Sequence, residues 1–325
     1  IFCELNEFRL FILLDMHVLK QSDEKSIFID QKIPRLSIAE KQKTLTSPIS
    51  FKGVGLHTGN KVSMTLHPAP INTGVVFRII KKQKKINIKA HYSNVKSTQL
   101  CTLLSDNTGV HNISTVEHIL SALHGLEIDN VYIDLDSNEV PVCDGSSLVF
   151  VDLLKKNGVQ PQNHFKNFIK IKKLIEVRDN EKIARVSPFD QTLITCSVEY
   201  QHECIGKQSI AIIQTPEIYE TQICSARTFG FLKDVNELKK KGLILGGSLD
   251  NAIVLDETKV LNKDGLRFSD EFVRHKVLDF IGDISLAGYK IIGSFFTSHS
   301  GHELNLKLIK EIFSSKENWE LVSSN

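Results

Sequence analysis

The sequence predicts an α+β protein built from two layered sheet and helix domains of similar topology that pack together. The chain has 325 residues, and domains average about 150 residues, so the length favours two. Each half carries strand-like alternation together with segments of helical periodicity, the pattern of layered α+β folds. Hydrophobic residues make up 41% and charged residues 24%, an ordinary globular composition. No sequence period supports the similarity of the two domains, which is a hypothesis about topology.

The first domain is expected over residues 43–164. Residues 1–42 mix charged and apolar groups without periodicity, so we interpret them as an N-terminal extension that is disordered or not translated. Residues 1–15 precede the first methionine, Met16. Apolar alternation predicts strands at residues 61–66 and 131–135, and helical patterns cover residues 115–126 and 146–156, the latter ending before Gly158.

The second domain is expected over residues 165–325, after a polar stretch at residues 161–164 that marks the boundary. A glycine-rich insert is expected near residues 230–267. The other predicted elements are strands at residues 168–177, 182–186 and 193–200, a long helix at residues 270–286 closed by Gly288, and a last helix after Gly301.

Composition excludes several classes of protein. Forty basic and thirty-eight acidic residues give a net charge of +2, too balanced for a dedicated nucleic-acid binder. The basic run at residues 81–85 fits a solvated strand end. Six cysteines without a C-x-x-C pair fit a reducing cytoplasm. The apolar stretch at residues 8–19 is interrupted by charge and is too short for a span of about 20 residues, so no stable membrane insertion is expected.

The long helix at residues 270–286 carries a polar stripe on an otherwise apolar surface. His275, Asp279 and Asp283 are four residues apart, which places them on one face. A His and a carboxylate one turn apart can supply two ligands to one metal ion. Hydrogen bonding within the helix is the alternative explanation, and the spacing alone favours it, because this spacing of His and Asp arises readily by chance.

The segment Ser-Thr-Val-Glu-His places Glu117 beside His118 at a predicted helix start. Ser114 and Glu117 match the capping box, in which the Glu carboxylate binds the N-cap amide. The alternative makes His118 a metal ligand and Glu117 the base that takes a proton from water. On spacing alone the cap is favoured.

Two further histidines lie close to glycines in the sequence. His302 follows Gly301 just before the last predicted helix, so its ring can project from a first turn, although a surface histidine is the simpler interpretation. His57 lies in the glycine-dense turn at residues 53–59 and could line a cleft. Residues 246–247 are a Gly-Gly pair among aliphatic residues, which fits either a strand bend or a narrow apolar channel.

Taken together, these segments resemble the zinc-dependent UDP-3-O-acyl-N-acetylglucosamine deacetylases, which catalyse the committed step of lipid A synthesis in Gram-negative bacteria. The resemblance runs in order from residue 43 to the last helix. Its carriers are GVGLHTG at 53–59, STVEH at 114–118, IDNVYIDLDSNEVPVCDGS at 128–146, ARTFGF at 226–231, LGGSLDNAIV at 245–254, DGLRFSDEFVRHKVLDFIGD at 264–283 and SGH at 300–302.

The resemblance implies two domains with the active site at their interface and one zinc ion (Zn2+) per chain, bound by His118, His275 and Asp279. Glu117 would be the general base. His302 would be charged, stabilise the oxyanion and protonate the leaving amine, with Asp283 as its partner. Thr228 would donate a hydrogen bond to the developing negative charge.

The resemblance also implies a UDP-sugar substrate that carries a fatty acyl chain. The implied substrate contacts are Lys276, Phe229, Phe231, Asp234, Lys182 and His57, and an apolar passage for the acyl chain that involves Gly247, Ser248, Ala252 and Val254. His299 lies where the family often carries Lys, a weaker cation towards phosphate. Cys101 lies in a segment that flanks the site, where a buried structural thiol is as good an interpretation as a functional one.

A cytoplasmic monomer that binds no nucleic acid is expected. Two alternatives stay open at this point. One is a zinc amidohydrolase for a different acylated sugar, and the other is a catalytically silent sugar-nucleotide binding protein, against which the retained Glu117, His302 and metal ligands argue.

Overall fold

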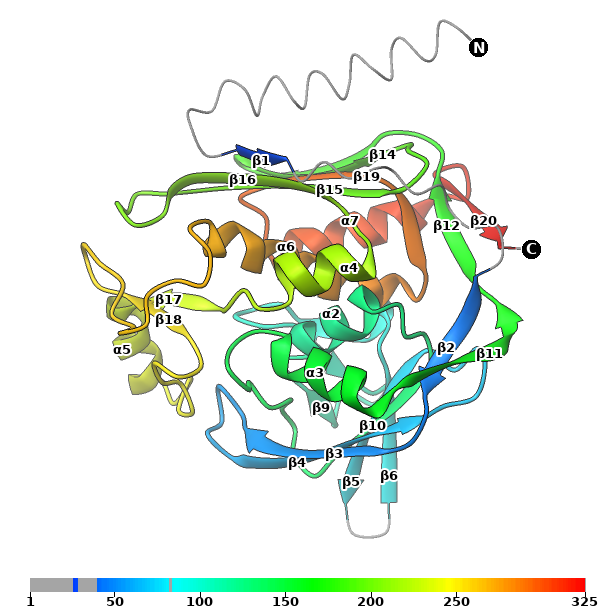
Figure 1. The fold of residues 1–325 in the computed structure, drawn as a ribbon, viewed down its shortest axis with the longest axis horizontal. Coiled ribbons are helices and arrows are strands. Elements are labelled where there is room, and N and C mark those ends of the chain that lie inside the picture. The colour runs from blue at the N-terminus through cyan, green and yellow to red at the C-terminus, as the bar shows by residue number, and fades with distance from the viewer. Residues whose placement is uncertain (1–25, 29–39, 82–83, 325) are drawn as a thin grey trace, which may run out of the picture.

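Two sheets enclose two layers of helices in the computed structural model, which describes residues 26–28, 40–81 and 84–324. Figure 1 shows the order sheet, helices, helices, sheet, with the second-half sheet at the top and the first-half sheet at the bottom. The mixed α+β fold predicted from the sequence is confirmed. The boundary between the two expected domains at residues 164 and 165 stays a prediction.

The first-half sheet has five strands in the order β3-β4-β10-β5-β6. Alternating apolar residues along a strand place one face of the sheet towards the core. In β4 the side chains of Val62, Met64 and Leu66 are buried, while those between them are more exposed. The bounds are β3 (Ile49–Val54), β4 (Lys61–Pro68), β5 (Val75–Lys81), β6 (Lys84–Lys89) and β10 (Val131–Leu135).

The second-half sheet has eight strands, with β1-β16-β15-β19-β12-β20 along the main path and β14 joining β13 to β19. The central β19 is buried along most of its length, as expected for a strand covered on both faces. The bounds are β1 (Ser26–Phe28), β12 (Asn167–Ile171), β13 (Ile175–Asp179), β14 (Lys182–Ser187), β15 (Thr192–Tyr200), β16 (Gly206–Ile213), β19 (Lys290–Ser298) and β20 (Trp319–Ser323).

The helices between the sheets share one hydrophobic core with both of them. Nearly every residue of α6 is buried, because α6 packs on β15 and β16 on one side and on α2 on the other. Gly288, with φ of 79°, ends the helical segment in the left-handed region. The bounds are α2 (Glu117–Gly125), α3 (Leu148–Asn157), α6 (Glu271–Ile284), η3 (Ser285–Ala287) and α7 (His302–Ser314).

Shorter elements complete the chain. The expected insert near residues 230–267 carries β17, α5 and β18 at one side of the molecule (yellow at the left of Figure 1). Its Ile253 and Leu255 form a small hydrophobic cluster with Ile205 and with Phe272 of α6. The bounds are β2 (Lys41–Leu45), η1 (Tyr92–Asn94), β7 (Val95–Ser97), β8 (Leu103–Ser105), β9 (Asn112–Ile113), β11 (Val159–Phe165), α4 (Pro216–Ile218), η2 (Tyr219–Ile223), β17 (Phe229–Phe231), α5 (Leu232–Lys240) and β18 (Ile253–Leu255).

Three expectations about elements need correction. The single strand expected at residues 168–177 is two strands, β12 and β13, because the chain leaves the sheet between them, where Leu174 is 48% exposed. The polar boundary stretch at residues 161–164 lies within β11, which pairs with β2. Residues 26–28, inside the expected extension, form β1 and pair with β16. The expectations for residues 1–15 and for the apolar stretch at 8–19 lie outside the described residues.

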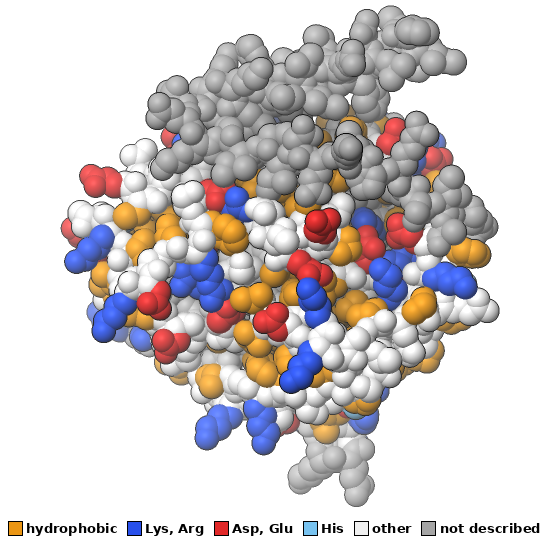
Figure 2. All heavy atoms as spheres, viewed as in Figure 1, with side chains coloured by type: hydrophobic (Ala, Val, Ile, Leu, Met, Phe, Trp, Pro, Cys, Tyr) orange, Lys and Arg blue, Asp and Glu red, His pale blue; other side chains and the backbone are white. Residues whose placement is uncertain are grey.

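Among the described residues, no helix has both the length and the hydropathy needed to cross a membrane. On the face shown in Figure 2, basic and acidic side chains are interspersed.

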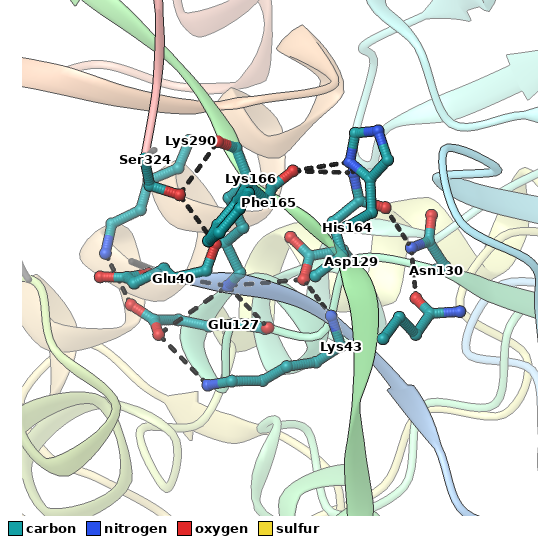
Figure 3. Close-up of polar contacts among 12 residues, drawn as sticks. Glu40, Lys43, Glu127, Asp129, Asn130, His164, Phe165, Lys166, Lys290 and Ser324 are labelled. Carbon is teal, nitrogen blue, oxygen red and sulfur yellow. Dashed lines mark hydrogen bonds and ion pairs between the residues drawn. The ribbon is translucent and has the colours of Figure 1, made fainter. Parts of the chain in front are cut away.

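A buried ammonium ties the start of β12 to the loop that follows α2 (Figure 3). The side chain of Lys166 is 5% exposed, and its Nζ lies 3.4 Å from Oδ2 of Asp129 and donates to the carbonyl of Glu127 at 3.1 Å. Lys290 adds a 2.7 Å ion pair to Glu127. Burial opposes ionisation of Glu127, but Lys290 and Lys166 outweigh it and lower the pKa of Glu127 to about 2. The Glu127 carboxylate is therefore ionised at neutral pH.

Replacing Lys166 by methionine is expected to lower the free energy of unfolding by about 3 kcal/mol, because removal of one partner leaves buried carboxylates uncompensated. The loss stays at the low end for such pairs because the side chain of Asp129 is 29% exposed and Glu127 keeps Lys290. Urea unfolding measures it. Lys170→Met is the matched control, since Lys170 in β12 pairs with a 92% exposed Asp190, and a change within about 0.5 kcal/mol is expected. Equal losses in both variants would contradict the prediction.

Candidate active site

The site lies where the first turn of α2 crosses α6. A glycine permits this crossing: a Cβ on Gly282 would lie 2.2 Å from the backbone oxygen of Glu117, closer than any contact a side chain tolerates. The two helices therefore touch backbone to backbone, and residues from the two halves of the sequence meet.

Three potential metal ligands converge at this crossing. Nε2 of His275 lies 3.3 Å and Nε2 of His118 lies 3.6 Å from Oδ1 of Asp279, and the three ligand atoms lie within 4.8 Å of one another. All three residues are buried. Ligands held about 2.0–2.2 Å from a tetrahedral zinc ion lie about 3.3–3.6 Å apart, so the donor types and their spacing fit a divalent metal.

The protonation states suit metal binding, since a ligand must present a free lone pair. Burial lowers the pKa of His275 to about 3, so its ring is neutral. Its Nδ1 lies 3.1 Å from the carbonyl of Ala226, to which it donates, and Nε2 is left free to ligate. Burial opposes the charge on Asp279, but the Lys276 ammonium, which donates to its Oδ2 at 2.9 Å, helps to hold the pKa of that carboxyl well below its usual range.

Glu117 does not cap its helix, so the capping-box interpretation is wrong. The N-cap of α2 is Val116, without a side-chain cap bond, and Thr115 has a φ of 59°, which ends the helical geometry before it can reach Ser114. The Glu117 carboxylate instead accepts a 3.1 Å hydrogen bond on Oε2 from the amide of Thr102. Burial raises the pKa of Glu117, against the opposing charge of His302.

His302 begins α7 and directs its ring at two carboxylates. Its Nδ1 donates to Oδ2 of Asp283 at 2.8 Å, and its Nε2 lies 3.8 Å from Oε1 of Glu117. Burial disfavours the charged ring, but Asp283 and then Glu117 outweigh burial and raise the pKa of His302 to about 10. The structure thus brings a cationic imidazole to the side of the carboxylate at the start of α2.

Lys276 lies on the other side of the metal-ligand group. Its Nζ donates to Oδ2 of Asp279 at 2.9 Å and lies 5.5 Å from the ring centroid of Phe229. Phe229 in turn meets the ring of His275 edge-on, with centroids 6.3 Å apart. Burial opposes the charge on Lys276, but the Asp279 carboxylate outweighs burial and raises the pKa of Lys276. The ammonium therefore stays charged beside the metal-ligand group.

The remaining residues implied by the resemblance lie further out. The backbone amide of Thr228 donates a 2.7 Å hydrogen bond to the carbonyl of Gly145. Phe231 packs on Tyr200. Of the described contacts, none joins the outer residues to the metal-ligand group. These outer residues are Phe231, Asp234 and Lys182, the last near Glu303 beside His302.

His57 and the Gly-Gly segment lie side by side. The amides of Leu245 and Gly246 donate to the carbonyls of His57 and Leu56 at 3.1 and 3.0 Å, and a Cβ on Gly247 would lie 3.6 Å from Leu56. The amide of Ser248 binds Asn251. Both ring nitrogens of His57 are buried without a partner among the described residues. The turn and the insert therefore form one wall, with Leu245 and Leu249 exposed on it.

His299 and Cys101 do not join the cluster. His299 has a φ of 52° and pairs with Ser298 through its ring. Cys101 is 6% exposed, and burial raises the pKa of its thiol to about 12, so the thiol is neutral at physiological pH.

Sequence analysis missed three polar residues at the site. Thr102 contacts both Glu117 and Asp283, and Asn305 donates to Asp283 at 2.8 Å. Glu139, fully buried, accepts hydrogen bonds from the turn at residues 57–58 and from Thr115. Asn305 follows His302 by three residues, which places both on one helix face and was a usable signal. Thr102 and Glu139 carry no sequence signal of this kind, except that each is a polar residue in apolar surroundings.

Residues 42–314 match the family model described as UDP-3-O-acyl N-acetylglycosamine deacetylase. Curated proteins named UDP-3-O-acyl-N-acetylglucosamine deacetylase from Histophilus somni (strain 129Pt) and Pasteurella multocida (strain Pm70) are each 47% identical over 285 residues, covering 87% of this chain and 93% of the relative. The relative of that name from Idiomarina loihiensis is 45% identical over the same lengths.

Proposed function

The chain belongs to the UDP-3-O-acyl-N-acetylglucosamine deacetylase family, and from this premise we propose how its site works. It hydrolyses the N-acetyl group of UDP-3-O-acyl-N-acetylglucosamine, giving UDP-3-O-acyl-glucosamine and acetate, the committed step of lipid A synthesis. The observation that carries the proposal is the meeting of His118, His275 and Asp279 beside Glu117 and His302. Such a set serves hydrolysis rather than binding alone.

Zinc is the proposed metal, one ion per chain, held by His118, His275 and Asp279. Two imidazoles and one carboxylate are the donors of several hydrolytic zinc sites. When bound, the metal supplies Lewis acidity towards water and the amide carbonyl.

Glu117 is the proposed general base. As water adds to the acetyl carbonyl carbon, one water proton passes to Glu117, and the carbonyl oxygen takes up negative charge. The raised pKa of Glu117 makes it a better proton acceptor than an exposed carboxylate. Its Oε1 is the oxygen that faces His302, because Oε2 is occupied by the Thr102 amide.

His302 is the proposed acid. Its cationic ring stabilises the negative oxygen, together with the Thr228 hydroxyl, and then gives its Nε2 proton to the amine nitrogen as the C–N bond breaks. Acetic acid leaves and loses its proton to solvent. With 3.8 Å between Nε2 and Glu117 Oε1, the proton on Glu117 can return to His302 and complete the cycle.

Substrate contacts are proposed on both sides of this centre. Lys276 and Phe229, which lie beside the metal ligands, contact the sugar nucleotide, with Phe231, Asp234 and Lys182 further along. The wall formed by His57, Gly247 and Ser248 holds the acyl chain. Burial of each methylene contributes about 0.8 kcal/mol, so an apolar wall there favours a long chain.

The test is acetate release by the purified protein from UDP-3-O-acyl-N-acetylglucosamine with acyl chains of several lengths. Release of one acetate per substrate is expected, with a rate that depends on chain length. A protein that releases acetate only from a different acylated sugar, or from none, would overturn the proposed function.

Replacing His302 by glutamine is expected to lower kcat by roughly 100-fold or more and to change the pH profile. The raised pKa means that the ring keeps its proton at neutral pH and loses it as pH rises through about 10. The wild-type activity should therefore fall on the alkaline side, and this limb should be absent in the variant. His67→Gln, at a partly exposed ring paired with Asp134, is the control and should keep the limb. A variant with an unchanged profile would argue against the acid role.

A further inference from the structure

Thr102 holds the two carboxylates on which the proposed proton transfers depend. It lies immediately before β8 and is 1% exposed. Its hydroxyl donates to Oδ1 of Asp283 at 2.8 Å, and its amide donates to Oε2 of Glu117 at 3.1 Å. One buried residue thus contacts both the base and the partner of the acid.

These two bonds fix which oxygens face His302. With Oδ1 of Asp283 bound by the Thr102 hydroxyl, Oδ2 accepts from His302 Nδ1 and from Asn305, both at 2.8 Å. With Oε2 of Glu117 bound by the Thr102 amide, Oε1 is the atom 3.8 Å from His302 Nε2. Each carboxylate therefore has one oxygen held by Thr102 and the other directed to a different nitrogen of the same ring.

The acceptor of the Thr102 hydroxyl is a side chain of the site. By contrast, the buried hydroxyl of Thr192 donates to the backbone carbonyl of Ile291 at 2.8 Å. Thr102 instead donates to a carboxylate, and a hydrogen bond to an ionised acceptor is about twice as strong as a neutral one. It also restrains orientation, because the Asp283 carboxylate is held by three hydrogen bonds, from Thr102, His302 and Asn305.

We propose that Thr102 is a positioning residue of the deacetylation: its hydroxyl holds Asp283, and its amide holds Glu117, in the orientation that aligns His302 with the base. The proposal rests on the proposed function. It places Thr102 outside direct contact with substrate, so its loss acts on turnover rather than on substrate binding.

The experiment compares Thr102→Val, which keeps the shape and removes the hydroxyl, with Thr102→Ser, which keeps the hydroxyl. For Thr102→Val, a roughly 10- to 100-fold fall in kcat is expected, the effect of losing one charge-assisted hydrogen bond, with KM within about twofold and zinc content unchanged. Thr102→Ser should stay within about threefold of the wild-type kcat. Thr192→Val is the matched control, because it loses a buried hydroxyl bond away from the site and should keep kcat whatever its melting temperature.

A second comparison tests the route through Asp283. In an Asp283→Ala background the Thr102→Val change should alter kcat less than twofold, because the acceptor of its hydroxyl is gone. If the Thr102→Val variant does not fold, Thr102→Ala takes its place, with kcat, KM and zinc content measured in the same way.

The outcomes separate the two levels of the argument. An active wild type whose Thr102→Val and Thr102→Ala variants keep kcat, or lose it only together with zinc, would overturn the role of Thr102 alone. Failure of Thr102→Ser to preserve kcat would overturn it as well. A wild type that releases no acetate from the UDP-linked substrate would refute the proposed function and this role with it.

Discussion

Glu117→Gln should purify with its zinc and yet turn over roughly 10²- to 10⁴-fold more slowly than the wild type, the usual contribution of a general base. The amide has the shape of the carboxylate and can still accept the hydrogen bond from Thr102, but it cannot take a proton from water. The fall should appear in kcat, because the residue acts in the transition state rather than in substrate binding.

The measurement pairs zinc content with steady-state kinetics on the same preparation. Glu317→Gln, at a side chain that is 83% exposed, is the control for the chemical change and should keep full activity. A Glu117→Gln protein with normal zinc and normal kcat would remove Glu117 as the base. Loss of zinc together with activity would point instead to a role in building the metal site.

Removal of the metal should lower turnover by roughly 10³-fold or more, since Lewis acidity towards water and carbonyl contributes several kcal/mol to such hydrolyses. Dialysis against a chelator followed by one equivalent of zinc should abolish and then restore acetate release. The melting temperature should fall in the metal-free protein, because the ion binds the native state.

A ligand variant distinguishes this site from adventitious metal. His275→Ala removes one of the three buried donors, so added zinc should neither bind at one equivalent nor restore activity. His67→Gln, which lies outside the metal-ligand group, should bind zinc like the wild type. Full activity in thoroughly metal-free protein would overturn the zinc assignment.

Part of this site could be predicted from local spacing. His275 and Asp279 are four residues apart on a strongly apolar helix, so periodicity alone places them on one buried face. Their approach to His118 could not be predicted in this way, because it depends on how α2 packs on α6. Only the resemblance to a family joined the segments, and the packing clue, Gly282, has no meaning until the helices are in place.

The failures have physical causes as well. Ser114 and Glu117 have capping-box spacing, but Thr115 at positive φ breaks the geometry, and a distant amide, that of Thr102, takes the carboxylate. β11 contains Gln, Asn and Pro, which a propensity argument keeps out of strands, but its pairing with β2 satisfies its backbone. Tertiary partners decided both cases.

The backbone contact at Gly282 limits how this enzyme can admit its substrate. Many two-domain proteins open by a hinge between their halves, but such a motion here would pull His118 on α2 away from His275 on α6 and dismantle the metal site at every turnover. Ile253 and Leu255 of the insert pack in a small cluster apart from the main core, and this cluster includes Phe272 of α6. We therefore expect the two halves to behave as one rigid body, with substrate entering and leaving without a hinge between them.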